Sequence, residues 1–327
     1  MPEYKYIPRG KNVGQLRNYV FNKNTPPILE VEPGEKFVAE TEDALNGILR
    51  KDPSKLYPRD AAPYSTHVPV WDNPLCGPIF VKGVEPGDVL VVSIEKIDKI
   101  LTGVAGTSPG AHHFTGLRDW EECDEMYTGI IENVEGKGTW TYEKHTYTWD
   151  LKPFIGTIAT APEFEVLSGI LTSFGSAPAC GGNIDCQDIK EGTKLYLQSF
   201  NEGGLLFFGD VHASQGDGEV LGANEVAAEV TLSCDVVKNK HLNNVRLETP
   251  ESLISVYCYR PMEEAVKQAL KDLILWLEED YKMSKREAYM LAGICPEFRI
   301  RVYQDCTGLG RLMITVGAEL SKKMLPK

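Results

Sequence analysis

Short runs of β-branched and aromatic residues, separated by turns, occupy about two thirds of the chain. Residues 90–94, 192–200 and 205–208 are examples in which such side chains lie between glycines. Runs of this kind are typical of strands. The pattern therefore predicts a mainly β structure for this part of the chain.

One turn pattern recurs ahead of three apolar runs. Residues 31–37, 84–90 and 189–195 share one pattern of seven positions. An apolar residue comes first and last, glycine is fourth, and a polar residue is fifth. In the first two copies proline precedes the glycine, which suits a type II turn that leads into a strand. Two interpretations stay open: an internal duplication of a β-module, or one common turn used three times.

Apolar positions with helical spacing appear only late in the chain. From Val266 to Leu277 they recur every three or four residues, with charged residues on the opposite face. Pro261 lies near the start, where a helix tolerates proline. The pattern predicts an amphipathic helix over residues 262–279 that packs within its own subunit.

A second helix and a strand are predicted after it. Ser284 and Glu287 have the spacing of a capping box, which indicates a helix from 285 to about 292. Gly293 and a following proline end it. Residues 298–303 alternate between apolar and polar, which predicts a closing strand.

Strands first and helices afterwards indicate an α+β fold with a dominant antiparallel sandwich or jelly roll. No linker-like or low-complexity stretch marks a boundary. We therefore divide the chain into residues 1–255, a β-rich catalytic region, and residues 256–327. The second part is a helical hairpin with a closing strand, packed on the same unit.

Composition and charge narrow the choice of partners and compartment. The 327 residues are 42% apolar, enough for a packed core, and their formal net charge of −13 disfavours nucleic acid and anionic membranes as partners. We find neither a signal peptide nor a segment apolar enough to span a membrane. Eight scattered cysteines without close pairs are typical of free thiols in a reducing cytosol, so we expect a cytoplasmic protein.

The densest polar cluster, residues 209–219, directly follows an apolar run. In an extended strand Asp210 and His212 would face the same side, about 7 Å apart, as half of a metal site or as an acid–base pair. Glycines on both sides of Asp217 allow a tight fold that returns Asp217 or Glu219 toward this pair. The alternative, held equally, is a hairpin turn with solvated acids.

Two further clusters are weaker. In residues 181–185, two glycines precede Asn183 and Asp185, which lie on one side of an extended chain. A glycine turn with local side-chain bonds is the favoured alternative there. For the acidic residues 40–43 a solvated loop is favoured.

Histidine and cysteine pairs are the remaining candidates. His112 and His113 would point opposite ways on a strand, so a surface loop is favoured over a chelate. Cys180 and Cys186 flank the second cluster without a local base or cation, so buried thiols are favoured over a nucleophile.

Four segments, in this order and spacing, resemble the acetamidase/formamidase family: residues 73–94, 181–185, 191–197 and 209–219. The last, GDVHASQGDGE, is highly specific. The likeness extends to residues 31–47 and to the C-terminal helices.

The resemblance implies hydrolysis of formamide, acetamide or a similar small amide, usually by a dimer. It also implies a jelly-roll-like β architecture with a smaller α/β part. We therefore expect an α+β, predominantly β fold: a jelly-roll-like antiparallel sandwich with a smaller α/β part and two C-terminal helices. The resemblance further supports Asp185, Asp210, His212 and Glu219 as metal ligands.

A divalent metal and a carboxylate together suit amide hydrolysis. The metal polarises the carbonyl, and the carboxylate carries a proton from water to the leaving nitrogen. We expect Glu219 to be a fourth ligand or the general base, with Asp217 in reserve. Mixed nitrogen and oxygen ligands favour zinc, with calcium, magnesium or manganese as alternatives.

Two features depart from the family pattern. Many shorter members have histidine directly before the Gly-Gly-Asn segment, where this chain has Cys180, and residues 106–150 have no counterpart in the resemblance. The irregular, Gly-, His- and Trp-rich composition of 106–150 indicates an active-site loop or a plain excursion. Two other functions stay open: a thiol amidase that uses Cys180 or Cys186, and a non-catalytic jelly-roll module that binds a metal or ligand.

Overall fold

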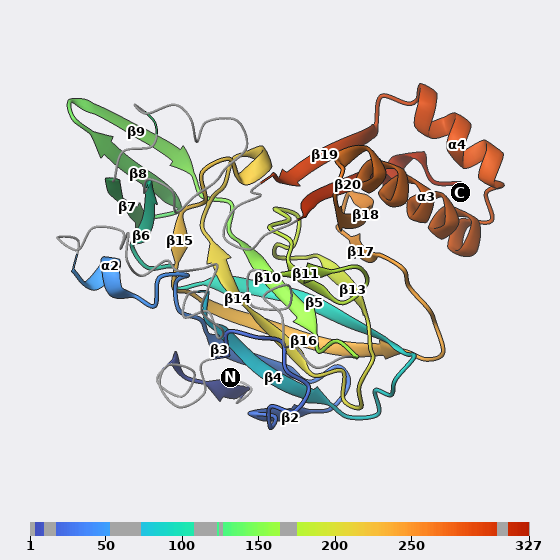
Figure 1. The fold of residues 1–327 in the computed structure, drawn as a ribbon, viewed down its shortest axis with the longest axis horizontal. Coiled ribbons are helices and arrows are strands. Elements are labelled where there is room, and N and C mark those ends of the chain that lie inside the picture. Colours follow the sequence, from blue (N-terminus) through green and yellow to red (C-terminus); the bar gives the residue numbers. More distant parts are fainter. Residues whose placement is uncertain are drawn as a thin grey trace.

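The computed structural model describes residues 4–9, 18–52, 73–107, 123, 127–163, 175–305 and 313–326. Over these ranges the chain is mostly β, with two large sheets and two long helices near the C-terminus (Figure 1). The expected class of fold is thereby confirmed. No helix in the described ranges is long and apolar enough to cross a membrane.

One sheet has nine strands, drawn from both ends of the chain. Its neighbouring strands are antiparallel except for the parallel pair at one edge, β1 and β3. In spatial order the strands are β1 (Lys5–Ile7), β3 (Lys36–Glu40), β16 (Glu229–Val237), β5 (Val89–Asp98), β13 (Lys194–Gln198), β17 (Val245–Glu248), β18 (Ser252–Tyr259), β20 (Ile314–Ser321) and β19 (Phe298–Gln304).

All three copies of the recurrent turn lead into strands of this sheet. Gly34, Gly87 and Gly192 have φ of 79°, 92° and 87°, the left-handed values that a type II turn requires at its third residue. β3, β5 and β13 begin shortly after these glycines. The predicted turns are confirmed, and they determine where the three strands start.

The second sheet has eleven strands and carries the polar clusters. β14 (Leu206–His212) pairs with β10 on one side and with β4 and β15 on the other. Ten strands besides β14 make up this sheet. They are β2 (Leu29–Val31), β4 (Leu75–Val81), β6 (Gly103–Thr107), β7 (Tyr127–Val134), β8 (Lys137–Tyr142), β9 (His145–Asp150), β10 (Phe154–Thr160), β11 (Ser176–Ala177), β12 (Gly181–Asn183) and β15 (Glu225–Val226).

Both sheets contribute to one hydrophobic core. The ring of Phe37 on β3 lies 6.4 Å from the ring of Phe208 on β14, centroid to centroid. Every residue of β10 and β14 is buried. Polar side chains on these two strands are therefore held inside the protein, where each needs a partner.

The C-terminal helices lie against the far end of the nine-stranded sheet (Figure 1). α3 (Met262–Tyr281) packs on β18 and β20 and buries Leu273 and Leu277. α4 (Lys285–Ile294) begins with the predicted capping box. Both helix predictions are confirmed, including the packing of α3 within its own subunit.

The strand β20 was not expected. It pairs with β18 over the whole length of that strand, and β19, the predicted closing strand, pairs with its other side. β18 itself crosses the proposed boundary at residue 255. The two parts of the chain therefore share one continuous sheet, because β20 joins the closing strand to the β-rich region.

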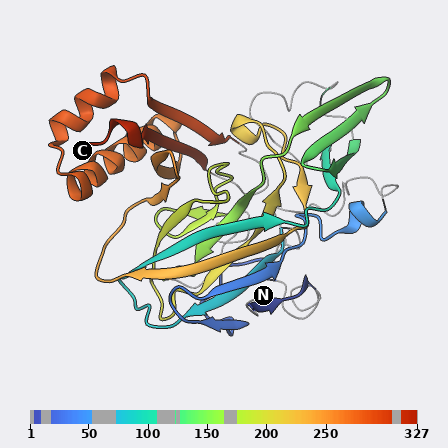
Figure 2. The ribbon, with the colours of Figure 1, turned by 180° about the vertical axis from the view of Figure 1, so that it is seen from behind.

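Residues 127–150 form regular strands, so the described part of the segment 106–150 is not an irregular loop. β8 and β9 make a hairpin that extends the eleven-stranded sheet and projects from the body of the molecule (Figures 1 and 2). His112 and His113 lie outside the described residues.

The acidic residues after β3 are not a solvated loop. Glu42 and Asp43 are buried, and the guanidinium of Arg50 is bonded to both carboxylates, with Nε 3.0 Å from Asp43 Oδ2. Arg50 lies on the short helix α2 (Ile48–Lys51), which folds back over the acids. The expectation was wrong because this cation comes from outside the segment considered.

Candidate functional site

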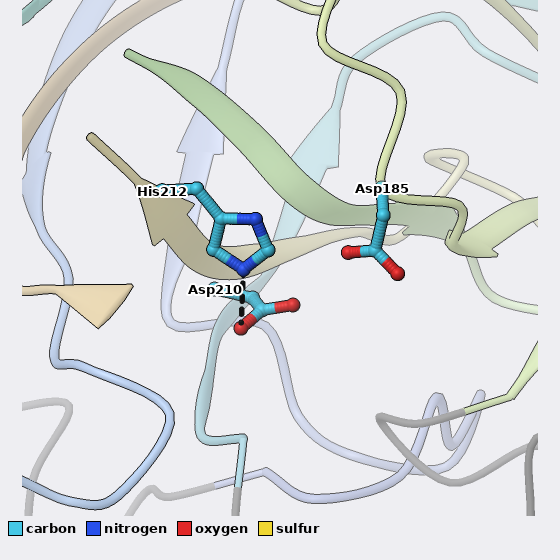
Figure 3. A group of neighbouring side chains, drawn as sticks. All are labelled: Asp185, Asp210 and His212. Atoms are coloured by element: carbon cyan, nitrogen blue, oxygen red, sulfur yellow. Dashed lines mark ion pairs between the residues drawn. The ribbon is translucent and has the colours of Figure 1, made fainter. Parts of the chain in front are cut away.

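Three buried side chains converge at the end of β14. One ligand atom from each of Asp185, Asp210 and His212 can be chosen so that all lie within 4.8 Å of one another. Figure 3 shows the three side chains turned toward a common point, with His212 Nε2 3.3 Å from Asp210 Oδ1. The hairpin turn with solvated acids, the alternative for this segment, is therefore wrong for Asp210.

The backbone of Asp210 has an unusual conformation. Its φ is 56°, a left-handed conformation that non-glycine residues adopt at a cost. The register with β10 is the same on both sides of this position. The pairing with β10 thus continues through a strained residue, and the side chains of Asp210 and His212, predicted to share one face, meet at hydrogen-bonding range.

Asp185 reaches the same point from the loop after β12. It also has a left-handed φ, of 47°, and its N–H donates to the carbonyl oxygen of Gly156 at 3.0 Å. A Cβ on Gly156 would lie 2.8 Å from Asp185 Oδ1 and 2.9 Å from Asp210 Oδ2. The absence of a side chain on Gly156 therefore makes the space that the two carboxylates occupy.

Asp210 is held by a buried network of polar side chains. Thr157 Oγ1 lies 3.0 Å from Asp210 Oδ2 and 2.7 Å from Asn183 Oδ1, and Asn73 Nδ2 donates to it at 3.2 Å. A glycine turn with only local side-chain bonds, the favoured alternative for residues 181–185, therefore does not describe this segment fully. Asn183 bonds to β10, and Asp185 joins the buried group.

Gln215 fixes the orientation of His212. Its Nε2 donates to the carbonyl oxygens of Asp185 and Tyr303, each at 3.1 Å. Its Oε1 therefore faces His212 Nδ1, 2.9 Å away, and must accept the proton of that nitrogen. The other ring nitrogen, Nε2, is left to point at the carboxylates.

Glu225 is a site residue that the sequence analysis missed. On β15 it lies directly across from His212, and its Oε2 is 3.2 Å from His212 Nε2. This oxygen is buried and has no hydrogen bond. No motif marks Glu225, because only the pairing of β14 with β15 brings it to the site.

The electrostatics of the group call for a cation. Burial, together with Asp210 and Glu219, raises the pKa of Glu225 to about 7 although His212 opposes the shift. Burial alone would lower the pKa of His212, but Glu225 and Asp210 raise it well above its ordinary value. A neutral His212 would direct a lone pair at carboxylate oxygens, so either a proton or a metal ion must lie between them. One nitrogen and several carboxylate oxygens form a donor set that fits a divalent metal.

Asp217 and Glu219 face opposite directions. They lie in a single turn of 3₁₀ helix in which Gly218 has a φ of 84°. Glu219 is buried and lies near enough to act on the pKa of Glu225, whereas Asp217 is exposed and accepts a bond from Arg301 Nη2 at 3.2 Å. Glu219 is not among the three residues whose ligand atoms converge, and neither is Asp217.

A cleft of about 790 Å³ adjoins the group on the Gln215 side. Gln215 and Phe154 line it, and the ring of Phe154 lies 5.0 Å from that of His212. Trp149, near the end of the projecting hairpin, also lines it. The hairpin of β8 and β9 therefore contributes to the surroundings of the site.

Comparison with known proteins agrees with these features. The sequence profile of the Acetamidase/Formamidase family matches residues 10–175 and 175–306. The chain belongs to the acetamidase/formamidase family. The family members of known structure include the acetamidase from Yersinia enterocolitica, with 31% identity, coverage of 100% of this chain and 94% of that one, and a TM-score of 0.83.

Two further relatives extend the comparison. The acetamidase from Bacillus halodurans is 26% identical, with 97% of each chain covered and a TM-score of 0.79. A formamidase from Methylophilus methylotrophus is 24% identical over 69% of this chain and 65% of its own length. The chain thus spans a little under two thirds of that curated family member.

The cysteines beside the site are poor nucleophiles. Cys180 is buried, and burial raises its thiol pKa to about 12. Burial also raises the pKa of Cys186 well above the ordinary value, with Asp188 adding to the effect. Both thiols are therefore protonated at neutral pH, which agrees with the prediction that Cys180 and Cys186 are buried thiols and not nucleophiles.

Gly156→Ala tests the packing of the two carboxylates. The added methyl group must displace Asp185 or Asp210, so we expect Zn²⁺ to bind about 10–100-fold more weakly, the usual cost of disturbing the support of a metal ligand. Calorimetric titration of the metal-free protein measures this. Gly216→Ala is the control, because Gly216 has an ordinary φ of −78° and open space around it. Equal affinities in the two variants would contradict the packing argument.

Proposed function

We propose that this protein hydrolyses a small aliphatic amide, similar to formamide or acetamide, to a carboxylate and ammonia at a divalent-metal site. The main support is that the buried side chains of Asp185, Asp210 and His212 lie close together in a chain of the acetamidase/formamidase family. Relatives named formamidase and acetamidase support the substrate class. Zinc is the favoured ion because the donors mix nitrogen and oxygen, with calcium, magnesium or manganese as alternatives.

In this proposal Asp185, Asp210 and His212 hold the ion. When bound, the ion supplies Lewis-acid chemistry that makes the amide carbonyl more electrophilic and water more acidic. Gln215 keeps the proton of His212 on Nδ1 and so leaves Nε2 available as a donor atom. The buried position of the group excludes bulk water, which strengthens each of these interactions.

Proton transfer is assigned to Glu219. Amide nitrogen leaves poorly unless it is protonated, so one group must take a proton from the attacking water and deliver it to nitrogen. Glu219 is buried beside Glu225, and the turn at Gly218 directs it inward. Asp217 stays the reserve candidate, and a role for Glu219 as a fourth ligand is the alternative. We further propose that the protein is a cytoplasmic homodimer.

Chelation and alkylation separate the metal mechanism from a thiol mechanism. We expect ammonia release from a panel of small amides to be lost after removal of metal with a chelator and to return with Zn²⁺. Iodoacetamide at pH 8 should leave activity intact, because the Cys180 thiol, with its pKa near 12, stays protonated.

The opposite pattern, loss on alkylation and resistance to chelation, would favour a thiol amidase that uses Cys180 or Cys186. A protein that binds metal but releases no ammonia from any amide would be a binding module.

Glu219→Gln tests the proton carrier. The substitution keeps the shape of the side chain and removes its basic oxygen, so turnover should fall by ~10²–10⁴, the usual contribution of general acid–base catalysis. Metal content should stay unchanged. Asp217→Asn is the matched control and should retain most activity, because Asp217 is exposed and paired with Arg301.

Two outcomes would overturn this assignment. Loss of metal together with activity would make Glu219 a ligand. An inactive Asp217→Asn variant beside an active Glu219→Gln variant would transfer the role to Asp217.

A further inference from the structure

Within the described residues, the projecting hairpin ends in a strand with an open edge. β9 is the last strand of the eleven-stranded sheet, and within the described residues no strand pairs with its outer side. Proteins usually protect such edges with proline, bulges or charges. β9 has no proline, its register with β8 is continuous, and its central residues Thr146, Tyr147 and Thr148 are uncharged. The edge is therefore suited to pairing with another strand.

The turn of the hairpin decides which backbone groups face this edge. Tyr142 pairs with His145 across a two-residue turn, and the residues that flank such a turn form a hydrogen-bonded pair. The N–H and C=O groups of His145 and Tyr147 therefore point toward β8. Those of Thr146 and Thr148 point outward, so an incoming strand must bond to these two residues.

The two faces of the hairpin differ in chemistry. On one face, threonine hydroxyls bond across the strands, Thr139 to Thr148 at 3.2 Å and Thr141 to Thr146 at 3.0 Å. The other face is aromatic, and its Tyr147 ring is stacked 5.7 Å from that of Trp140. Tyr147 is nevertheless 51% exposed. A matching partner strand should continue both the threonine face and the aromatic face.

We propose that β9 pairs with β9 of a second copy of this chain, antiparallel about a two-fold axis at Tyr147. Thr146 then lies opposite the partner's Thr148. In this register the outward backbone groups of the two strands bond to each other, and the threonine face continues across both copies. Lys144, in the turn directly before β9, then lies within side-chain reach of the partner's Asp150. The two-fold symmetry repeats each of these pairs, as an isologous interface requires.

Charge selects this register among those that the backbone permits. The backbone N–H and C=O groups of every second residue of β9 point outward. Two copies of β9 can therefore pair only in registers that place these residues opposite one another. With the axis at Thr148, Lys144 would lie beyond the end of the partner's β9 and nearest to its Lys152, which repels it. With the axis at Thr146, Lys144 would face the partner's Thr148 and no carboxylate. Only the axis at Tyr147 brings Lys144 to an opposite charge.

Asp150 already forms an exposed ion pair with Lys137 of its own chain, and this pair lowers its carboxyl pKa. In the paired hairpins Asp150 would lie between that lysine and the partner's Lys144. The aromatic faces would become one continuous surface, and part of the exposed ring of Tyr147 would be buried.

Charge reversal with complementation tests the pairing. Sedimentation velocity on the full chain should show a dimer at micromolar concentration. Lys144→Asp places two carboxylates opposite each other at both ends of the interface, so the dimer dissociation constant should rise by about 10-fold or more. Asp150→Lys should do the same. An equimolar mixture of the two variants should recover the dimer, because each strand then meets an opposite charge at both positions.

Two further variants make the result specific. Thr148→Pro removes an outward N–H that β8 does not use, so the hairpin should keep its fold while the dimer is lost. Lys271→Asp, on the exposed face of α3, carries the same charge change away from the hairpin and should leave the dimer intact. A monomeric wild-type protein, a dimer that resists Lys144→Asp and Thr148→Pro, or a mixture that fails to recover would each overturn the proposal.

Discussion

Buried negative charge is the constraint on which the site and much of its surroundings depend. Asp185, Asp210 and Glu219 are each at most 2% exposed, and Glu225 joins them across the strand pair. Carboxylates in such a setting are tolerated only with hydrogen bonds or a cation. The left-handed φ angles of all three buried acids show that the backbone is also strained to place them, as is typical of functional sites.

The supporting residues act by limiting the freedom of these acids and of His212. Gly156 leaves space beneath two carboxylates, Thr157 bonds to one of them, and Gln215 fixes the proton of His212. Gln215 also bonds to the backbone of Tyr303 on β19. The C-terminal part of the chain therefore helps to fix the geometry of the site, although Tyr303 is distant from the site residues in the sequence.

The projecting hairpin of β8 and β9 lies next to the site. Trp149 ends the projecting hairpin, donates to Ser214 Oγ at 2.8 Å and lines the cleft beside Gln215. The base of the hairpin is thereby fastened to the segment that carries His212. A partner bound along β9 would therefore lie near this cleft.

Local patterns in the sequence determined the family, the β-rich class, the three glycine turns, both C-terminal helices and the candidacy of Asp185, Asp210 and His212. These features depend on neighbours a few residues apart, or on a specific motif, and are visible in a single chain. The tertiary structure decided the rest, because it depends on strand pairing between distant segments. Only the pairing of β14 with β15 brings Glu225 to His212, only β10 places Gly156 under the carboxylates, and only the folded α2 supplies Arg50 to Glu42 and Asp43. Long-range partners leave no periodic signal, since no local spacing records which strands become neighbours.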